Sequence, residues 1–228
     1  MIPRLVSLVD VDNTLLDNDT VSNDLREHLE TRFGPASSAR YWEIFEQIRA
    51  EIGYADYLGA LQRYRIQHPE EPLLEASLFL IDYPFADRLY PRALDVIAHL
   101  RQRGPVVIFS DGDAVFQPRK VWRSGLWEAV DGQVLIYIHK EAMLHDVERR
   151  YPADRYLLID DKLRILDAVK SVWRERVTTV FPRQGHYARD PEIVSRYPAA
   201  DVTVERIGDL LTDQRGFHLP LESRSSHR

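Results

Sequence analysis

The sequence of 228 residues predicts an α/β fold in which helices cover both faces of a mostly parallel sheet, giving a three-layer α/β/α core. Short continuous apolar runs recur along the chain, and segments with helical spacing separate most of them. One long stretch near the start contains helical segments but no convincing strand. Continuous apolar runs that alternate with helices are typical of a parallel sheet buried on both faces. We therefore expect such a core with a helical insertion.

The predicted strands are the short apolar runs. The first run ends abruptly at an aspartate, and the last is weaker than the others: Leu5–Val9, Val106–Phe109, Val134–Ile138, Tyr156–Ile159, Val177–Phe181 and Asp201–Val204. Among the helices between them, Arg92–Arg103 has Pro91 near its start and Gly104 after its end, which is the usual asymmetry of a helix. Further helical candidates are Leu144–Tyr151 and Leu163–Arg176.

Residues 17–88 interrupt this alternation. Apolar side chains at Trp42, Phe45 and Ile48 follow helical spacing, and Pro69 and Pro72 mark a turn. The expected helices of this stretch are Ser22–Phe33, Ala39–Ile52, Tyr54–His68 and Leu73–Tyr83. We expect a core formed by residues 1–16 and 89–212, a helical insertion at 17–88, and a loose C-terminal tail at 213–228.

The composition excludes several classes of site and partner. The chain has no cysteine, so disulfides, thiolate metal sites and cysteine nucleophiles are excluded. A net charge of −6 without a basic, aromatic-rich run argues against nucleic-acid binding. No apolar run approaches the roughly 18 residues of a membrane span. Arg4 and the early acidic residues argue against a signal peptide, so the expected location is the cytoplasm.

Two aspartates at the end of the first predicted strand are the most informative feature of the chain. Side chains at positions i and i+2 of an extended strand point the same way, so Asp10 and Asp12 project toward one place. Two like charges held so close are costly unless a cation or a shared proton neutralises them. The simplest function is a Mg²⁺-bound nucleophile beside a general acid/base.

Polar residues also follow the next three predicted strands. These are Ser110-Asp111-Gly112, then Lys140, then Asp160-Asp161. Ligands of open α/β sheets bind at the carboxyl ends of the strands. A hydroxyl with a glycine turn, a lysine and a pair of carboxylates are therefore expected to converge on Asp10 and Asp12.

In these four motifs the chain resembles the haloacid dehalogenase superfamily of hydrolases. The motifs appear in the family's order: Asp10-Val11-Asp12-Asn13-Thr14-Leu15, Ser110, Lys140 and Asp160-Asp161. The resemblance covers Met1 to about Leu211 and implies a Rossmann-like core with a helical cap inserted between the first two motifs. The chain departs from the common pattern at Glu141, where many members have proline, and at Asp111, where asparagine is common. Neither departure removes a group that the chemistry needs.

The resemblance implies a Mg²⁺-dependent phosphatase that acts on a small soluble phosphomonoester through an aspartyl-phosphate. Asp10 would be the nucleophile and Asp12 the general acid/base. Ser110 and Lys140, with Asp111 and Gly112 of the turn, would bind the phosphoryl oxygens. The metal ligands would be Asp10, the main-chain carbonyl of Asp12, Asp160 and Asp161. The expected partner is a small phosphorylated metabolite, and the chain is expected to be a monomer or a homodimer.

The residues leave structural alternatives open. Asp10 and Asp12 also suit a turn that caps a helix, and Asp160 or Asp161 suits the N-cap of the helix that starts near Leu163. Lys120 competes with Lys140 for the role of catalytic lysine. Because Lys120 lies in a predicted helix from Gln117 to Gly125, we expect it to be a solvated helix residue.

Functional alternatives also remain. A phosphomutase, a phosphonate hydrolase or a non-catalytic binding protein can use the same core. A phosphonate hydrolase would need a Schiff-base lysine from the insertion, which contains none. A dehalogenase is disfavoured by Asp12, because dehalogenating members have no carboxylate at that position. Aromatic and basic residues of the insertion either face the substrate or lie in a helix interface or on a solvated face: Tyr54, Tyr57, Arg63, Tyr64 and Arg65.

Overall fold

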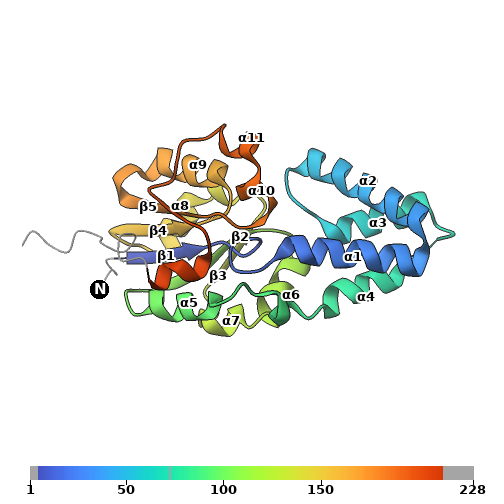
Figure 1. Cartoon of the computed structure of the whole chain (residues 1–228), viewed down its shortest axis with the longest axis horizontal. Coiled ribbons are helices and arrows are strands. Elements are labelled where there is room, and N and C mark those ends of the chain that lie inside the picture. The colour runs from blue at the N-terminus through green and yellow to red at the C-terminus, as the bar shows by residue number, and fades with distance from the viewer. Residues whose placement is uncertain (1–4, 72, 213–228) are drawn as a thin grey trace, which may run out of the picture.

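The computed structural model describes residues 5–71 and 73–212. Its six strands form one sheet in the order β3-β2-β1-β4-β5-β6, and every pair of neighbouring strands is parallel (Figure 1). The strands are β1 (Leu5–Val9), β2 (Val106–Asp111), β3 (Val134–Tyr137), β4 (Arg155–Ile159), β5 (Val177–Pro182) and β6 (Val202–Val204). Each predicted strand is present, with small differences at its ends. The predicted fold class is confirmed.

Alternation along the central strand β1 builds a hydrophobic core on each face of the sheet. Leu5 and Val9 belong to one core, whereas Val6 and Leu8 belong to the other. Side chains of successive strand residues point to opposite faces, so a fully apolar strand needs cover on both sides. Helix α5 (Ala93–Arg101) covers the first face, and helices α8 (Leu144–Arg150) and α9 (Leu163–Trp173) cover the second. Figure 1 shows the resulting three layers.

The remaining elements of the sheet-bearing part are short. Helix α6 (Phe116–Arg123) follows β2, and a 3₁₀ turn, η2 (Lys140–Ala142), follows β3. Both begin at the carboxyl edge of the sheet, where the candidate site lies. The others are α7 (Leu126–Ala129), η3 (Arg174–Arg176), α10 (Gly185–Arg189), α11 (Pro191–Val194) and η4 (Ile207–Leu211).

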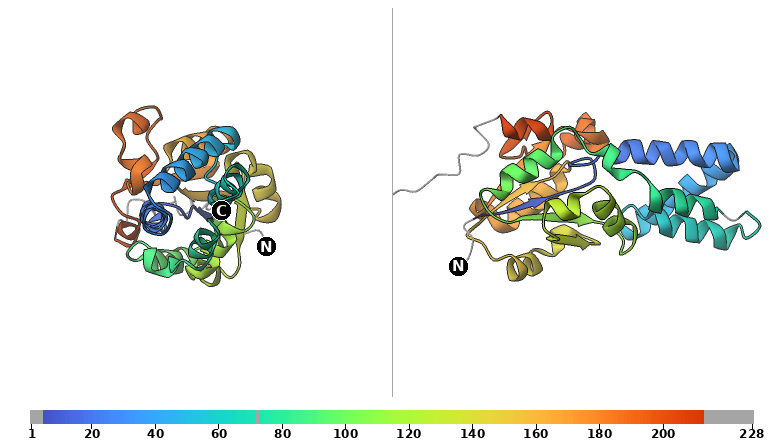
Figure 2. Two further views of the ribbon diagram at one scale, coloured as in Figure 1. Left: turned by 90° about the vertical axis from the view of Figure 1, so that its right-hand side faces the viewer. Right: turned by 90° about the horizontal axis from the view of Figure 1, so that it is seen from below.

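Four of the α-helices between β1 and β2 extend beyond the carboxyl ends of the strands (Figures 1 and 2). They are α1 (Asn18–Phe33), α2 (Pro35–Ile52), α3 (Tyr57–Gln67) and α4 (Leu74–Asp82), and η1 (Phe85–Arg88) follows them. Helix α1 starts before the predicted Ser22 because the Asp17 side chain caps it, accepting the main-chain N–H of Thr20. The residue bounds of core and cap stay a prediction, and the predicted tail at 213–228 lies outside the described residues.

Within residues 5–71 and 73–212, none of the helices has both the length and the apolar character that crossing a bilayer requires.

Candidate active site

Asp10 stands at the carboxyl end of β1, in the middle of the sheet, and is only 3% exposed. Both of its carboxylate oxygens are held. Lys140 Nζ lies 2.5 Å from Oδ1, and the Thr14 hydroxyl donates to Oδ2 at 3.2 Å. Thr14 in turn accepts the main-chain N–H of Asp161 at 3.0 Å. The first motif therefore holds its own aspartate in one orientation and ties it to the end of β4.

Lys140 is completely buried and joins two of the motifs. Besides Asp10, its ammonium contacts Asp160 Oδ2 at 2.6 Å and donates to the carbonyl of Phe109 at 3.1 Å. Burial opposes the charge of the ammonium, but the nearby carboxylates of Asp10 and Asp160 outweigh burial and raise the pKa of Lys140. The lysine therefore stays charged, as a ligand for anionic oxygens should.

Asp10, Asp160 and Asp161 each offer an oxygen within 4.8 Å of the others, which is the spacing of a metal site. Asp161 is 1% exposed, and neither of its oxygens has a hydrogen-bond partner among the described residues. Burial raises the pKa of Asp161 well above its ordinary value. Burial also raises the pKa of Asp160, to about 6, although Lys140 opposes the rise. A buried, unpaired carboxylate is costly, and a divalent cation with hard-oxygen preference fits this set.

The helix-capping alternative does not account for the pair Asp160-Asp161. Asp160 Oδ1 accepts the main-chain N–H of Lys162 at 2.8 Å, but no side chain caps the start of α9. Asp161 Oδ1 and Oδ2 accept no hydrogen bond within the described residues. One carboxylate therefore orders the turn, and the other is left for a ligand.

Asp12 is held by a second buried lysine. Lys120 Nζ lies 2.6 Å from Asp12 Oδ1, and the Gln117 amide donates to Asp12 Oδ2 at 3.2 Å. Lys120 is 1% exposed, so the prediction that it is a solvated helix residue is wrong. Gln117 and Lys120 are three residues apart on α6 and therefore share a helix face, and this face points toward the end of β1 rather than into solvent.

The second motif lies next to this contact. Gln117 also donates to the hydroxyl of Ser110, at 2.9 Å, so one amide joins Asp12 to Ser110. Asp111 Oδ1 accepts the main-chain N–H of Lys140 at 2.7 Å. A Cβ at Gly112 would lie 2.6 Å from the Gln117 side chain, so only glycine lets the turn approach α6 this closely.

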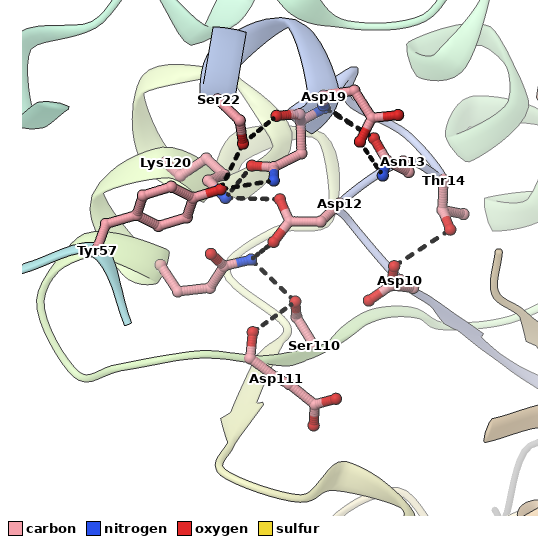
Figure 3. Close-up of polar contacts among 12 residues, drawn as sticks. Asp10, Asp12, Asn13, Thr14, Asp19, Ser22, Tyr57, Ser110, Asp111 and Lys120 are labelled. Carbon is pink, nitrogen blue, oxygen red and sulfur yellow. Dashed lines mark hydrogen bonds and ion pairs between the residues drawn. The ribbon is translucent and has the colours of Figure 1, made fainter. Parts of the chain in front are cut away.

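The helical insertion reaches the same place through Asn18 at the start of α1. Its side-chain oxygen accepts a hydrogen bond from Lys120 Nζ at 2.9 Å, and its amide donates to the Tyr57 hydroxyl at 3.2 Å. Tyr57 shares a 2.6 Å hydrogen bond with Ser22. Figure 3 shows this network running from Asp12 through Lys120 to the insertion. The side chain proposed as acid/base is thus connected to the helices that cover it.

A cavity of about 730 Å³ opens between the sheet edge and the insertion. Asp12 and Asp161 line it, whereas Asp10 is buried and is not among the lining residues. Of the insertion residues singled out in the sequence, Tyr54 and Tyr57 line the cavity. Arg63 instead pairs with Glu51 at 2.8 Å, and Arg65 is exposed and does not line the cavity. The volume is in the range of small-molecule sites.

The structure thus brings every candidate residue of the four motifs to one edge of the sheet. Sequence reasoning missed Lys120 and Gln117 as members of the site. A signal was present, because Phe116, Gln117, Lys120 and Val121 occupy one helix face and include two apolar residues. A helix that directly follows a strand also starts at the carboxyl edge, where ligands bind.

No protein-family model and no curated protein matches the chain. Among solved structures, one from Burkholderia xenovorans, described as a haloacid dehalogenase-like hydrolase, is 62% identical with a TM-score of 0.90. The match covers 93% of this chain and 97% of that one.

Two more distant structures share the fold. The L-2-haloacid dehalogenase of Xanthobacter autotrophicus is 19% identical with a TM-score of 0.60, over 92% of this chain and 97% of that one. A HAD hydrolase of Bacillus subtilis, bound to magnesium, is 18% identical with a TM-score of 0.60, over 93% of this chain and 98% of that one. The Burkholderia relative is similar enough to establish the family: the chain belongs to the haloacid dehalogenase-like hydrolases.

Proposed function

We propose that the protein is a Mg²⁺-dependent phosphatase that hydrolyses small phosphomonoesters through an aspartyl-phosphate on Asp10. The observation that carries this proposal is the Asp161 carboxylate, buried without a hydrogen-bond partner among the described residues, beside Asp10 and Asp160. Such a group calls for a divalent cation, and Lys140 next to it supplies charge for an anionic substrate.

The first step transfers the phosphoryl group to the enzyme. A carboxylate oxygen of Asp10 attacks phosphorus while the bond from phosphorus to the ester oxygen breaks. Asp12 donates a proton to the leaving oxygen, which departs as an alcohol. Lys140 and Ser110 stabilise the charge that accumulates on the phosphoryl oxygens.

The second step restores the enzyme. Asp12, now a carboxylate, takes a proton from a water that attacks phosphorus, and the bond between Asp10 and phosphorus breaks to release inorganic phosphate. Asp10, Asp160, Asp161 and the main-chain carbonyl of Asp12 would hold Mg²⁺, which neutralises charge on the phosphoryl oxygens when bound.

Asp12 favours phosphate esters over haloacids as substrates. A halide leaves without a proton, whereas an alkoxide needs one. The side chain of Asp12 is 26% exposed and lines the cavity, so a leaving group in the cavity can reach it. The fixed contacts with Lys120 and Gln117 hold it there.

The test is Mg²⁺-dependent phosphate release over a panel of alkyl and aryl phosphates, with Asp10→Asn as the decisive variant. The substitution preserves the shape of the side chain but removes the nucleophile. We expect the rate to fall by about 10⁴-fold or more for all substrates. Activity retained in Asp10→Asn would contradict the proposed chemistry.

Oxygen labelling separates the phosphatase from a dehalogenase. In ¹⁸O-enriched water, a phosphatase places solvent oxygen in the released phosphate and leaves Asp10 unlabelled, because water attacks phosphorus. A dehalogenase hydrolyses a carboxylic ester of the aspartate, so solvent oxygen enters Asp10 itself. Mass spectrometry of the Asp10 peptide after turnover of 2-chloropropanoate, measured beside a phosphate ester, distinguishes these outcomes.

A further inference from the structure

The cavity contains more positive groups than one phosphoryl group requires. Lys140 and Ser110, which we assign to the first phosphoryl group, are buried and do not line it. The wall itself includes Arg26, Arg49, Lys162 and Arg196. Arg26 lies over the Trp42 ring at 4.4 Å, and no carboxylate pairs with Arg26 or Arg196 among the described residues. Five acidic residues also line the cavity, but within the described residues none of them forms an ion pair with Arg26, Lys162 or Arg196: Asp12, Asp19, Glu46, Asp111 and Asp161. A cation without an ion-pair partner in a ligand cavity can provide binding energy for an anion.

Lys162 is the most informative of these cations because of its position. It follows Asp161 directly, so it stands at the boundary between the proposed phosphoryl site and the open cavity. Its Nζ lies 5.3 Å from the centre of the Tyr187 ring. It forms no ion pair in the described part of the chain, and the charges of Asp161, Asp10 and Asp160 act on it from a longer distance. Tyr187 belongs to α10, on the sheet-bearing side of the cavity.

Arg49 approaches the same ring from the insertion. It lies in the last turn of α2, and its guanidinium carbon is 5.5 Å from the Tyr187 ring centre. Arg49 pairs with Glu46 at 3.4 Å, on the same helix, and the Glu46 side chain is 61% exposed. An exposed ion pair of this kind contributes little, so Arg49 can exchange it for a ligand. Lys162 and Arg49 thus face one aromatic ring from opposite walls.

We propose that the substrate carries a second anionic group, a carboxylate or a second phosphate, which binds between Lys162 and Arg49 at Tyr187. This inference rests on the proposed function, because it assumes that the first phosphoryl group binds at Asp10. The ester is then held at both ends, with its organic part in the cavity. Binding at the second end positions the phosphorus for attack and discriminates against neutral esters.

The experiment compares esters of matched length. Propyl phosphate has no charged group besides its phosphate and serves as the neutral-chain ester, 3-phosphooxypropanoate carries a carboxylate, and propane-1,3-diyl bisphosphate carries a second phosphate. We expect kcat/KM for at least one anionic ester to exceed that for propyl phosphate by about tenfold or more, as charge-assisted hydrogen bonds predict. In Lys162→Gln and in Arg49→Gln this ratio should fall toward one. The ratio is taken within each variant, so a general loss of activity cancels.

Arg65→Gln is the matched control. Arg65 is an exposed arginine of the same insertion that does not line the cavity, and its removal should leave the ratio unchanged. Lys162→Arg should retain the preference. Equal loss for neutral and anionic esters in Lys162→Gln would assign Lys162 to the first phosphoryl group and overturn the inference.

The outcomes separate the inference from the proposed function. Mg²⁺-dependent hydrolysis of all three esters without preference contradicts the second anion site and leaves the phosphatase intact. If no ester is hydrolysed, the proposed function fails, and calorimetry then decides the anion site by comparing 3-phosphonopropanoate with propylphosphonate. Equal affinity for these two phosphonates would overturn it, whereas a preference that disappears in Arg49→Gln would support it.

Discussion

Asp161 is a single residue whose carboxylate would be stabilised by a bound cation. Its carboxylate is buried at the end of β4 without a hydrogen-bond partner among the described residues, and burial raises its pKa. In the metal-free protein this group opposes folding, because desolvation of the charged form is not compensated. In the proposed function, a bound ion would make the same group favourable. Stability and the proposed metal binding would then be linked at this one side chain.

Asp161→Asn should make the metal-free protein more stable and abolish its stabilisation by Mg²⁺. The metal-free variant is expected to gain about 1–3 kcal/mol in the free energy of unfolding, since a neutral amide costs less to bury than an unpaired carboxylate. Mg²⁺ should raise the melting temperature of the original protein but not that of the variant. Thermal unfolding with Mg²⁺ and with a chelator measures both effects. A variant that is stabilised by Mg²⁺ as strongly as the original would remove Asp161 from the metal site.

Lys120 lies outside the four motifs, but the structure places it against Asp12, where we expect it to position that side chain. Lys120→Met removes the charge that holds Asp12 Oδ1. We expect kcat for alkyl phosphates to fall by about 10²-fold, within the usual contribution of a general acid. An aryl phosphate such as p-nitrophenyl phosphate should lose much less, because its leaving group needs no proton.

Arg119→Met is the control for Lys120→Met, because Arg119 lies on the same helix but contacts Asp82 and Ile81 of α4 rather than Asp12. Arg119→Met should change neither kcat for alkyl phosphates nor kcat for p-nitrophenyl phosphate. An equal loss for both substrate types in Lys120→Met would mean that the lysine supports the fold and does not position Asp12.

The residues of the motifs could be predicted because their signal is local. Asp10 and Asp12 follow an apolar strand directly, and Lys140 and Asp160 follow two others. Parallel strands end at one edge, so order along the chain translates into proximity. Lys120 could not be placed in the same way. Its burial depends on which face of α6 turns toward Asp12 and Asn18, and that is set by packing between distant segments.

Side-chain caps determine the first residues of helices whose starts the apolar pattern did not predict. Asp56 accepts the main-chain N–H of Gly59, so α3 starts at Tyr57 and not at Tyr54. Asn13 has a φ of 60° and accepts the N–H groups of Asn18 and Asp19, which joins the first motif to the start of α1. The apolar periodicity predicts that helices exist, but side-chain caps fix where they begin.

Glu71 ties the helices of the insertion together. One of its oxygens accepts hydrogen bonds from Tyr64, Ser37 and Arg40, which come from α3 and α2. These bonds lower the pKa of Glu71 from its ordinary value of 4.5 to about 2. A carboxyl group whose folded pKa is depressed stabilises the fold above its unfolded pKa, and this contribution is lost as the pH falls through the folded value.

Glu71→Gln should therefore be less stable than the original protein at pH 7, and the difference should shrink as the pH falls from about 4.5 toward about 2. Urea unfolding at a series of pH values measures this difference directly. Glu70→Gln, at the exposed neighbouring position, should show no such pH-dependent difference. A difference that stays constant across this range would show that the Glu71 contacts do not favour the charged form.

At the scale of the whole molecule, the insertion closes over the sheet edge through contacts with α10. His186 pairs with Asp19 of α1 at 2.6 Å, and Tyr187 faces Arg49 of α2. A Cβ at Gly185, whose φ is 69°, would lie 2.4 Å from that of Asn13. Glycine therefore permits the close approach of α10 to the first motif.

These contacts explain how far prediction from the sequence could go. The order of strands and helices predicts the layers and the carboxyl edge, because both follow from local patterns and from the rules of parallel sheets. The walls of the cavity include residues of α1, α2, α3, α6, α9, α10 and α11. No spacing within the sequence relates Arg49 to Tyr187, so the substrate-facing surface required the tertiary structure.

A crystal structure of the protein soaked with Mg²⁺ and vanadate, which imitates a phosphoryl group in transfer, would show whether Asp10 is the nucleophile beside a bound metal ion. We expect a metal ion bound by oxygens of Asp10, Asp160 or Asp161, with vanadium bonded to an oxygen of Asp10 and within reach of Lys140 and Ser110. Vanadate bound away from Asp10, or a metal ion that does not contact these aspartates, would contradict it.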